Sequence, residues 1–396
     1  MSHAVVIKNA EHLDIYSKVF DELIEAIREN YDTRNLEGGR QLPWKGVRLL
    51  KDFRFGAITL PKELGGAGAS FVDLFRAVIQ LAWADPELAH IFQAHFKTVE
   101  FLLQDESAAS FRILKEVRQG AMIGNAHQED VEHQVGGGTY DSKLVKEGDH
   151  FRLHGKKALT AGTYYADYIE VTAKLDEKLV KVIIPVEREG VTPRDDWDGF
   201  GQKRSGIGTT IFDHVHVDKD EIFTLNDEQS SYFLLSHLYI QGILAGIVKR
   251  IVTDAVELIK KGKHSVGGKA SEAKQDPQLQ QVIGELSSYA FAAESLVLQA
   301  AAKMDDARFG QGDTKTEHQA ALGSLQAKVV IEKLALKAAN VLFDIGDASL
   351  TKQSEHLDRH WRNIRTLASL HSTLDQTRTI GNVHLNQQKL PSKHDY

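Results

Sequence analysis

The chain has 396 residues, carries a net charge of −7 and contains no cysteine. The lack of cysteine excludes disulfides, thiolate catalysis and cysteine-ligated metal centres, and the acidic balance argues against a nucleic-acid-binding protein. No apolar run approaches about 18 residues, and no basic segment precedes an apolar stretch at the N-terminus. We therefore expect a cytoplasmic protein with no membrane-spanning helix and no signal peptide.

Hydrophobic periodicity divides the chain into three parts. Residues before about 115 carry apolar side chains at helical spacing, as at Val19, Leu23 and Ile27. Residues from about 120 to 217 alternate between apolar and polar side chains, as in Thr210–Val217, which indicates short strands. After about residue 230, several segments with the length and period of helices indicate a helical bundle.

These patterns predict an α+β fold that is mostly α. We expect an N-terminal helical domain at residues 1–119, a central small β-barrel or sandwich at 120–226, and a C-terminal four-helix bundle at 227–396. The length of the chain is sufficient for two or three domains of this size.

Four separated motifs connect this architecture to a known family. They are Leu60–Gly68, Gly155–Gly162, Trp197–Phe212 and Asp358–Thr366. Together they resemble motifs of the acyl-CoA dehydrogenase superfamily. The Trp-Asp-Gly-Phe-Gly-Gln and Asp-Arg-His-Trp-Arg-Asn runs look most like its flavin-dependent monooxygenase branch, which includes dibenzothiophene monooxygenase and sulfur-acquisition oxidoreductases. The resemblance covers about residues 11 to 387 and implies a homotetramer with the flavin between the β domain and the bundle.

His371 stands where the dehydrogenases of this family carry a catalytic glutamate, and Arg378 keeps the family's spacing of seven residues after it. A carboxylate can abstract the α-proton of an acyl thioester, whereas an imidazole can also donate a proton to a leaving oxygen. This exchange predicts different chemistry on the same fold. The resemblance also places an active-site histidine near His95, so we expect His95 and His371 to be the catalytic pair across the flavin.

The resemblance implies a set of flavin-binding residues. The expected contacts are Asn125, His127, Thr160, Trp197 and Ser205 at the ring, with Arg359, His360 and Arg362 supporting the pocket or phosphate. Lys203 occupies the position of the family's arginine in the third motif. A cationic loop containing Lys263 replaces the motif that holds the pyrophosphate of FAD, which favours FMN.

The predicted function is oxygenation of a small hydrophobic organosulfur or aromatic substrate by reduced FMN and O2, through a C4a-hydroperoxyflavin. No nicotinamide site is visible, so a separate flavin reductase is expected as partner. One alternative is an FAD-dependent acyl-CoA dehydrogenase with its base moved to Glu332 or Glu285. Another is a flavin-binding or scaffold protein without catalysis. Glu87 and His90 have the spacing of a di-iron site but no second copy, so no metal is expected there.

Overall fold

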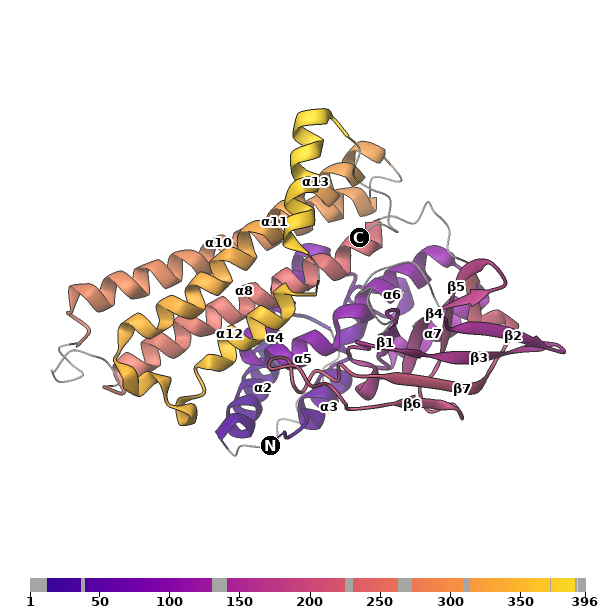
Figure 1. Ribbon diagram of the computed structural model, residues 1–396, viewed down its shortest axis with the longest axis horizontal. Coiled ribbons are helices and arrows are strands. Elements are labelled where there is room, and N and C mark those ends of the chain that lie inside the picture. The colour runs from indigo at the N-terminus through magenta and orange to yellow at the C-terminus, as the bar shows by residue number, and fades with distance from the viewer. Residues whose placement is uncertain are drawn as a thin grey trace.

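The computed structural model describes residues 13–36, 40–129, 141–224, 231–262, 273–309, 313–370, 372–388 and 390. The described chain runs through helices, a central sheet and helices again, which confirms the predicted mostly helical α+β fold (Figure 1). Among the described helices, none is both long enough and apolar enough to cross a bilayer.

The first helical segment precedes the sheet. Its helices are α2 (Lys18–Leu36), α3 (Trp44–Asp52), α4 (Phe71–Ala84), α5 (Pro86–Ile91), α6 (Gln93–Asp105) and α7 (Ala108–Arg118). Helix α4 begins with a capping box between Ser70 and Asp73, and α5 begins with Asp85 as its N-cap. The continuous helix predicted from Leu88 to Leu103 is interrupted at Phe92, between α5 and α6.

The central segment forms one eight-stranded sheet. Its strands are β1 (Ile123–Ala126), β2 (Lys143–Glu147), β3 (His150–Lys157), β4 (Tyr168–Leu175), β5 (Lys178–Pro185), β6 (Val191–Pro193), β7 (Thr210–Val217) and β8 (Ile222–Thr224). The order is β6-β7-β3-β2-β4-β5-β8, and β1 and β2 both pair in parallel with β4. Alternating residues such as Ile169 and Val171 face a core that belongs to the sheet alone.

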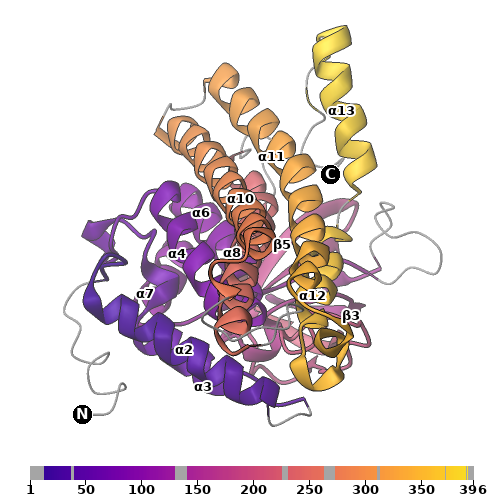
Figure 2. The same cartoon turned by 90° about the vertical axis from the view of Figure 1, so that its left-hand side faces the viewer.

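The second helical segment is the predicted bundle. Its helices are α8 (Ser231–Lys260), α10 (Pro277–Phe309), α11 (Thr314–Val341), α12 (Asp358–Ala368) and α13 (Thr373–Asn386). Helices α8, α10 and α11 run alongside one another, and α12 lies against α8 and α11 (Figures 1 and 2). Helix α13 extends away from the other helices in both views and contacts α11.

Helix α8 joins the two helical segments through one shared hydrophobic core. It packs closely on α4, because a Cβ atom at Gly246 would lie only 2.5 Å from the Cβ of Ala82. Small side chains at this crossing let the two backbones approach. The N-terminal helices and the bundle therefore form one packed body.

A buried ion network fixes α12 against α8. Asp254 on α8 accepts hydrogen bonds from Arg250 at 2.7 Å and from Arg359, and its second oxygen lies 2.8 Å from Nε2 of His360. Arg250 also donates to Asp32 on α2 at 2.6 Å. Burial opposes ionisation of Asp254, but Arg359, His360 and Arg250 outweigh it and hold the pKa of that carboxyl well below its usual range.

Replacing Asp254 by Asn should lower the free energy of unfolding by about 3–5 kcal/mol, because two buried guanidinium groups lose their counter-charge. Urea denaturation at neutral pH measures this. The matched control is Asp358→Asn, which removes an exposed pair with Arg362 and should change stability by less than about 1 kcal/mol. Equal losses in the two variants would contradict the assignment.

Candidate active site

Three predicted flavin segments meet where β3 ends. Asn125 on β1 donates from Nδ2 to the carbonyl of Ala161 at 3.2 Å, and the Thr163 hydroxyl donates to the carbonyl of Asn125 at 2.9 Å. The N–H of Gly162 donates to the carbonyl of Ser205 at 3.2 Å. The turn 158–162 therefore lies between β1 and the loop 197–208, and we call this region the junction.

Thr160 is buried in the junction. Its hydroxyl donates to the carbonyl of Gly208 at 3.0 Å and lies 2.9 Å from the hydroxyl of Thr210. Because the Thr160 hydroxyl has one proton, Thr210 must be the donor in the second contact. Thr160 can therefore offer a further ligand a lone pair but no proton.

Trp197 and Ser205 shape the loop 197–208 from within. The indole N–H of Trp197 donates to the carbonyl of Gly201 at 2.9 Å, and the buried Ser205 hydroxyl donates to the carbonyl of Gln202 at 2.9 Å. Both side-chain donors are thus committed to the backbone of their own loop. Their contribution to a ligand site is to fix the loop that surrounds it.

Helix α12 holds this loop from outside. Asn363 accepts a hydrogen bond from the N–H of Gln202 at 2.8 Å, and Arg362 donates to the carbonyl of Phe200 at 3.3 Å. Trp361 stacks on Phe200 with ring centroids 5.7 Å apart. A Cβ atom at Gly201 would lie 2.2 Å from the carbonyl oxygen of Arg362, so the loop backbone touches the helix directly.

Gln202 is a strained and buried residue at the centre of these contacts. Its φ is 54°, and Leu159 in the facing turn has φ 53°. Residues other than glycine rarely adopt such a left-handed backbone conformation. Such strain concentrates at functional sites. One atom of the Gln202 amide lies 3.1 Å from Nδ1 of His90, and the other is buried without a hydrogen-bond partner in the described part of the chain. A polar ligand atom at this point would satisfy it.

His95 is a positioning residue in this geometry. Its Nδ1 accepts a hydrogen bond from the N–H of Ile123 at 3.0 Å, so Nε2 carries the proton and donates to the carbonyl of Gly56 at 2.9 Å. Burial lowers the pKa of His95 to about 4. Because both ring nitrogens are occupied, the expected proton transfer from His95 to substrate is not what this arrangement offers. The ring instead fixes the start of β1, two residues before Asn125.

His127 lies in a buried ion cluster. Its Nε2 is 3.3 Å from Glu170 and its Nδ1 is 2.8 Å from the hydroxyl of Thr172. Lys97 and Lys181 also face Glu170, at 3.7 and 3.2 Å. Burial, followed by the charge of Lys97, holds the pKa of His127 well below its usual range, so the ring is neutral. The expected contact of His127 with the flavin ring has no counterpart among these interactions, which all lie within the ion cluster.

Arg359 and His360 face Asp254 rather than the junction, since both side chains engage that carboxylate. Of the expected basic residues on α12, Arg362 is the one that contacts the loop 197–208. The motif Asp358–Thr366 therefore acts mainly as a bracket between the bundle and the loop. A direct phosphate contact by Arg359 or His360 would require them to leave a buried counter-ion.

Lys203, which stands at the position of the family's arginine, and its neighbour Arg204 have different surroundings. Lys203 is exposed, whereas the N–H of Arg204 donates to Glu87 at 3.1 Å and its guanidinium donates to Asn35 at 2.8 Å. Glu87 is thereby paired with a cation. Glu87 and His90 belong to no metal-compatible group within the described ranges.

Two expected site residues, His371 and Lys263, lie outside the described residues, so their roles stay predictions. The residues that reasoning from the sequence missed are Gln202, Asn363 and Glu170. Gln202 and Asn363 stand inside recognised motifs and could have been singled out as amides among aromatic and charged neighbours. Nothing in the sequence singles out Glu170 as a functional residue, because it lies in a strand of ordinary composition.

Buried neutral histidines should make the protein sensitive to acid. Burial lowers the pKa values of His90, His95 and His360 to about 4, against about 6.5 in an unfolded chain. Between these values the unfolded chain binds protons that the folded chain does not, so stability falls as pH falls, by up to about 1.4 kcal/mol per pH unit and imidazole. Urea unfolding of wild type between pH 6.5 and 4 measures the slope.

The variant His95→Gln should flatten this slope and lose about 1–3 kcal/mol at neutral pH, because the acceptor for Ile123 is removed. His384→Gln, at an exposed position on α13, should leave both quantities unchanged. A slope in His95→Gln identical to that of wild type would show that His95 is already protonated or exposed.

Two family models match the chain. The acyl-CoA dehydrogenase N-terminal domain matches residues 9–106, and the acyl-CoA dehydrogenase C-terminal domain matches residues 238–376. The chain is 27% identical over 359 residues to dibenzothiophene monooxygenase of Mycolicibacterium goodii, covering 84% of this chain and 85% of that protein. It is 27% identical over 360 residues to the "Probable FMNH2-dependent monooxygenase SfnC" of Pseudomonas putida, covering 86% and 87%.

A solved structure gives the same picture of the fold. FMN-bound TdsC from Paenibacillus sp. A11-2 superposes with a TM-score of 0.86 at 22% identity, covering 99% of both chains. The two family models together span more than half of the sequence and lie on either side of the sheet. The chain belongs to the acyl-CoA dehydrogenase superfamily.

Proposed function

We propose that this chain is a flavin-dependent monooxygenase that uses reduced FMN and O2 to oxygenate a small hydrophobic organosulfur or aromatic substrate. Support comes from relatives over more than four fifths of the chain, one named as a dibenzothiophene monooxygenase and one as FMNH2-dependent. The observation in the chain itself that carries the proposal is the junction, where three flavin motifs meet and Asn363 fixes Gln202.

The polar groups of the junction suit the edge of a flavin ring. Asn125 is oriented by its hydrogen bond to Ala161, and its side-chain oxygen makes no hydrogen bond within the described residues. That oxygen and the lone pair of Thr160 can accept from ring N–H groups. The unpartnered amide atom of Gln202 supplies a further polar contact. The donor and acceptor types of these residues therefore match those at the polar edge of the ring.

Reduced FMN, when bound, supplies the reaction with O2. The part of the protein is to hold the ring, exclude water and deliver a proton to the departing oxygen. Thr160, Gln202 and Ser205 are buried, so the junction already excludes solvent on the side of the sheet. Ala158, where the family's dehydrogenases have tryptophan, leaves space next to the turn for an aromatic substrate.

The partners follow from this chemistry. A separate flavin reductase would supply reduced FMN, and the cationic residue Lys263 would bind its terminal phosphate. A homotetramer in the cytoplasm is the assembly that we propose from the family resemblance. The use of FMN rather than FAD agrees with the relatives, of which SfnC is named as FMNH2-dependent and TdsC was solved with FMN bound.

The alternative acyl-CoA dehydrogenase activity needs a carboxylate base near the ring. Glu332 on α11 is buried, and its two carboxylate oxygens are engaged by Lys328 and Thr373. Glu285 on α10 pairs with Lys337 at 3.0 Å, and the hydrogen bond from Tyr289 lowers the pKa of its carboxyl. Neither arrangement favours proton abstraction from a thioester.

Oxygen transfer can be measured directly. The protein, FMN and a flavin reductase driven by NADH, with dibenzothiophene or indole, should give a product that carries an atom from isotopically labelled O2. Peroxide should fall below the amount formed by reductase and FMN alone. Peroxide at the same level with no product from either compound, together with bleaching of bound FAD by acyl-CoA, would replace the proposal by the dehydrogenase alternative.

We also propose that His371 donates the proton during oxygen transfer. His371→Gln should lower the rate of product formation by about a hundredfold or more, the lower end of general acid catalysis, and the oxygen that is no longer transferred should appear as additional peroxide. The dissociation constant for reduced FMN should not change. His384→Gln serves as the control because its side chain is exposed on α13. Unchanged coupling between FMN oxidation and product in His371→Gln would remove the residue from the mechanism.

A further inference from the structure

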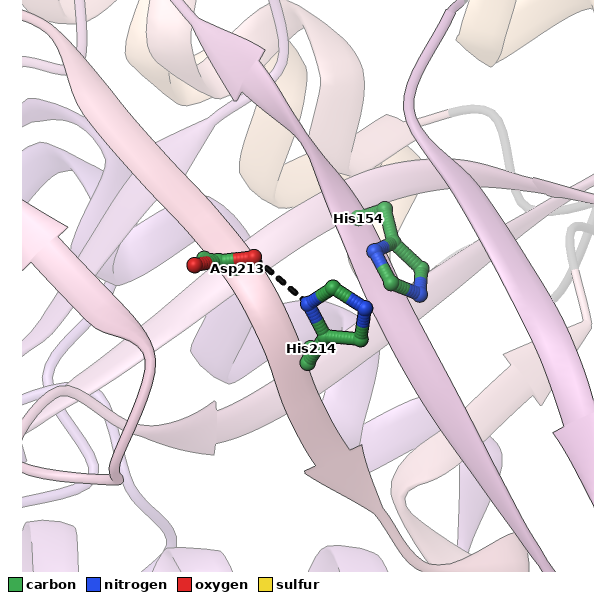
Figure 3. Close-up of side chains that lie close together, drawn as sticks. All are labelled: His154, Asp213 and His214. Atoms are coloured by element: carbon green, nitrogen blue, oxygen red, sulfur yellow. Dashed lines mark hydrogen bonds and ion pairs between the residues drawn. The ribbon is translucent and has the colours of Figure 1, made fainter.

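Strands β3 and β7 contain a β-bulge that gathers three metal-binding side chains. Leu153 pairs with Val215 and Gly155 pairs with Phe212, so His154 opposes both Asp213 and His214. In a regular strand, two consecutive residues point to opposite faces. Here His214 has φ 53°, and the bulge brings Asp213 and His214 together beside His154 (Figure 3).

The three side chains are close enough to share one ion. One donor atom from each of His154, Asp213 and His214 lies within 4.8 Å of the others. The two imidazole rings are 4.3 Å apart between centroids and meet edge to face at 80°. Nδ1 of His214 lies 2.6 Å from Oδ1 of Asp213, which leaves Nε2 of that ring available to an ion.

We propose that His154, Asp213 and His214 bind a divalent transition-metal ion of the zinc type. Zn²⁺ takes imidazole nitrogen and carboxylate oxygen at about 2.0–2.2 Å, and sites with three protein ligands hold water at the fourth position. Donor atoms in such a tetrahedron are roughly 3.3–3.5 Å apart. The observed donor atoms, which lie within 4.8 Å of one another, would move closer by no more than about 1.5 Å to reach these distances.

The carboxylate of Asp213 can either bind the ion or hold His214 in one orientation, as carboxylates beside zinc-binding histidines do. Both arrangements require the same three residues.

The same two strands provide a natural comparison. His150 and His216 also stack, with ring centroids 4.5 Å apart. Each is tied to its own carboxylate, His150 to Glu147 at 3.1 Å and His216 to Asp218 at 2.9 Å. This second pair forms no metal-compatible group within the described residues. The bulge, rather than the number of histidines, therefore distinguishes the proposed site.

An ion at the bulge would act as a clamp between β3 and β7. The same strand pair ends where Lys157 pairs with Thr210, about 10 Å along the strands from His154 and Asp213 at about 3.3 Å per residue. The ion would thus stabilise the sheet without touching the junction. The proposal stands independently of the flavin chemistry.

The test uses the full-length protein, stripped of metal with a chelator that is then removed. Isothermal titration with Zn²⁺ should show one equivalent bound, and Co²⁺ should give the visible absorption of a tetrahedral site. Zinc should also raise the Tm. His214→Asn and His154→Asn should each weaken binding by about tenfold or more, while His216→Asn should leave it unchanged.

The two ligand variants protect the test against a folding failure, since His154 is in a regular backbone conformation and His214 is not. Binding that weakens equally in His216→Asn would show adventitious binding to surface histidines and overturn the proposal. Full-strength binding in both ligand variants, or no binding of Zn²⁺ to wild type, would overturn it as well.

Discussion

The carboxylate of Asp254 is the interaction on which the arrangement of this protein depends. It neutralises Arg250 and Arg359 inside the protein, and through Arg250 it is connected to Asp32 on the first described helix. Three helices from both helical segments are thereby held in one relative position. Helix α12 then carries this order to the loop 197–208 by way of Asn363. The geometry of the junction therefore depends on the ion network of Asp254, because that network sets the position of α12.

Neutral histidines are a second theme of the interior. His90, His95 and His360 are buried, and each has its pKa lowered to about 4. A neutral imidazole carries a donor at one edge and an acceptor at the other, so it can connect two backbone or amide groups across a gap. His95 does so between β1 and the short 3₁₀ helix Phe55–Ala57. A histidine in a recognised motif region can therefore be essential to a site without touching its ligand.

Much of the fold follows from periodicity in the sequence, because helical and alternating patterns report directly on which faces are buried. The break at Phe92 between α5 and α6 could not be predicted in this way, since no proline or glycine marks it. For the site, the segments that contain Asn125, Thr160 and Ser205 lie side by side, through the contacts of Asn125 with Ala161 and of Gly162 with Ser205, and their roles toward a flavin stay predictions. The role of Arg359 was harder to predict, because the direction of its side chain depends on a packing partner, Asp254, that is far away in sequence. The left-handed backbone conformation of His214 and Gln202 could not be predicted either, because in the sequence only glycine signals such a conformation.

The direct contact between Gly201 and the backbone of Arg362 has a thermodynamic consequence. Helix α12 and the loop 197–208 cannot open independently, so they should form one cooperative unit of local unfolding. Any ligand held by the loop will reduce hydrogen exchange at the amides of α12, although it never touches that helix. Conversely, local unfolding of α12 will weaken the affinity of the loop for its ligand. The bracket motif on α12 can thus set how long a bound molecule stays, separately from the groups that hold it.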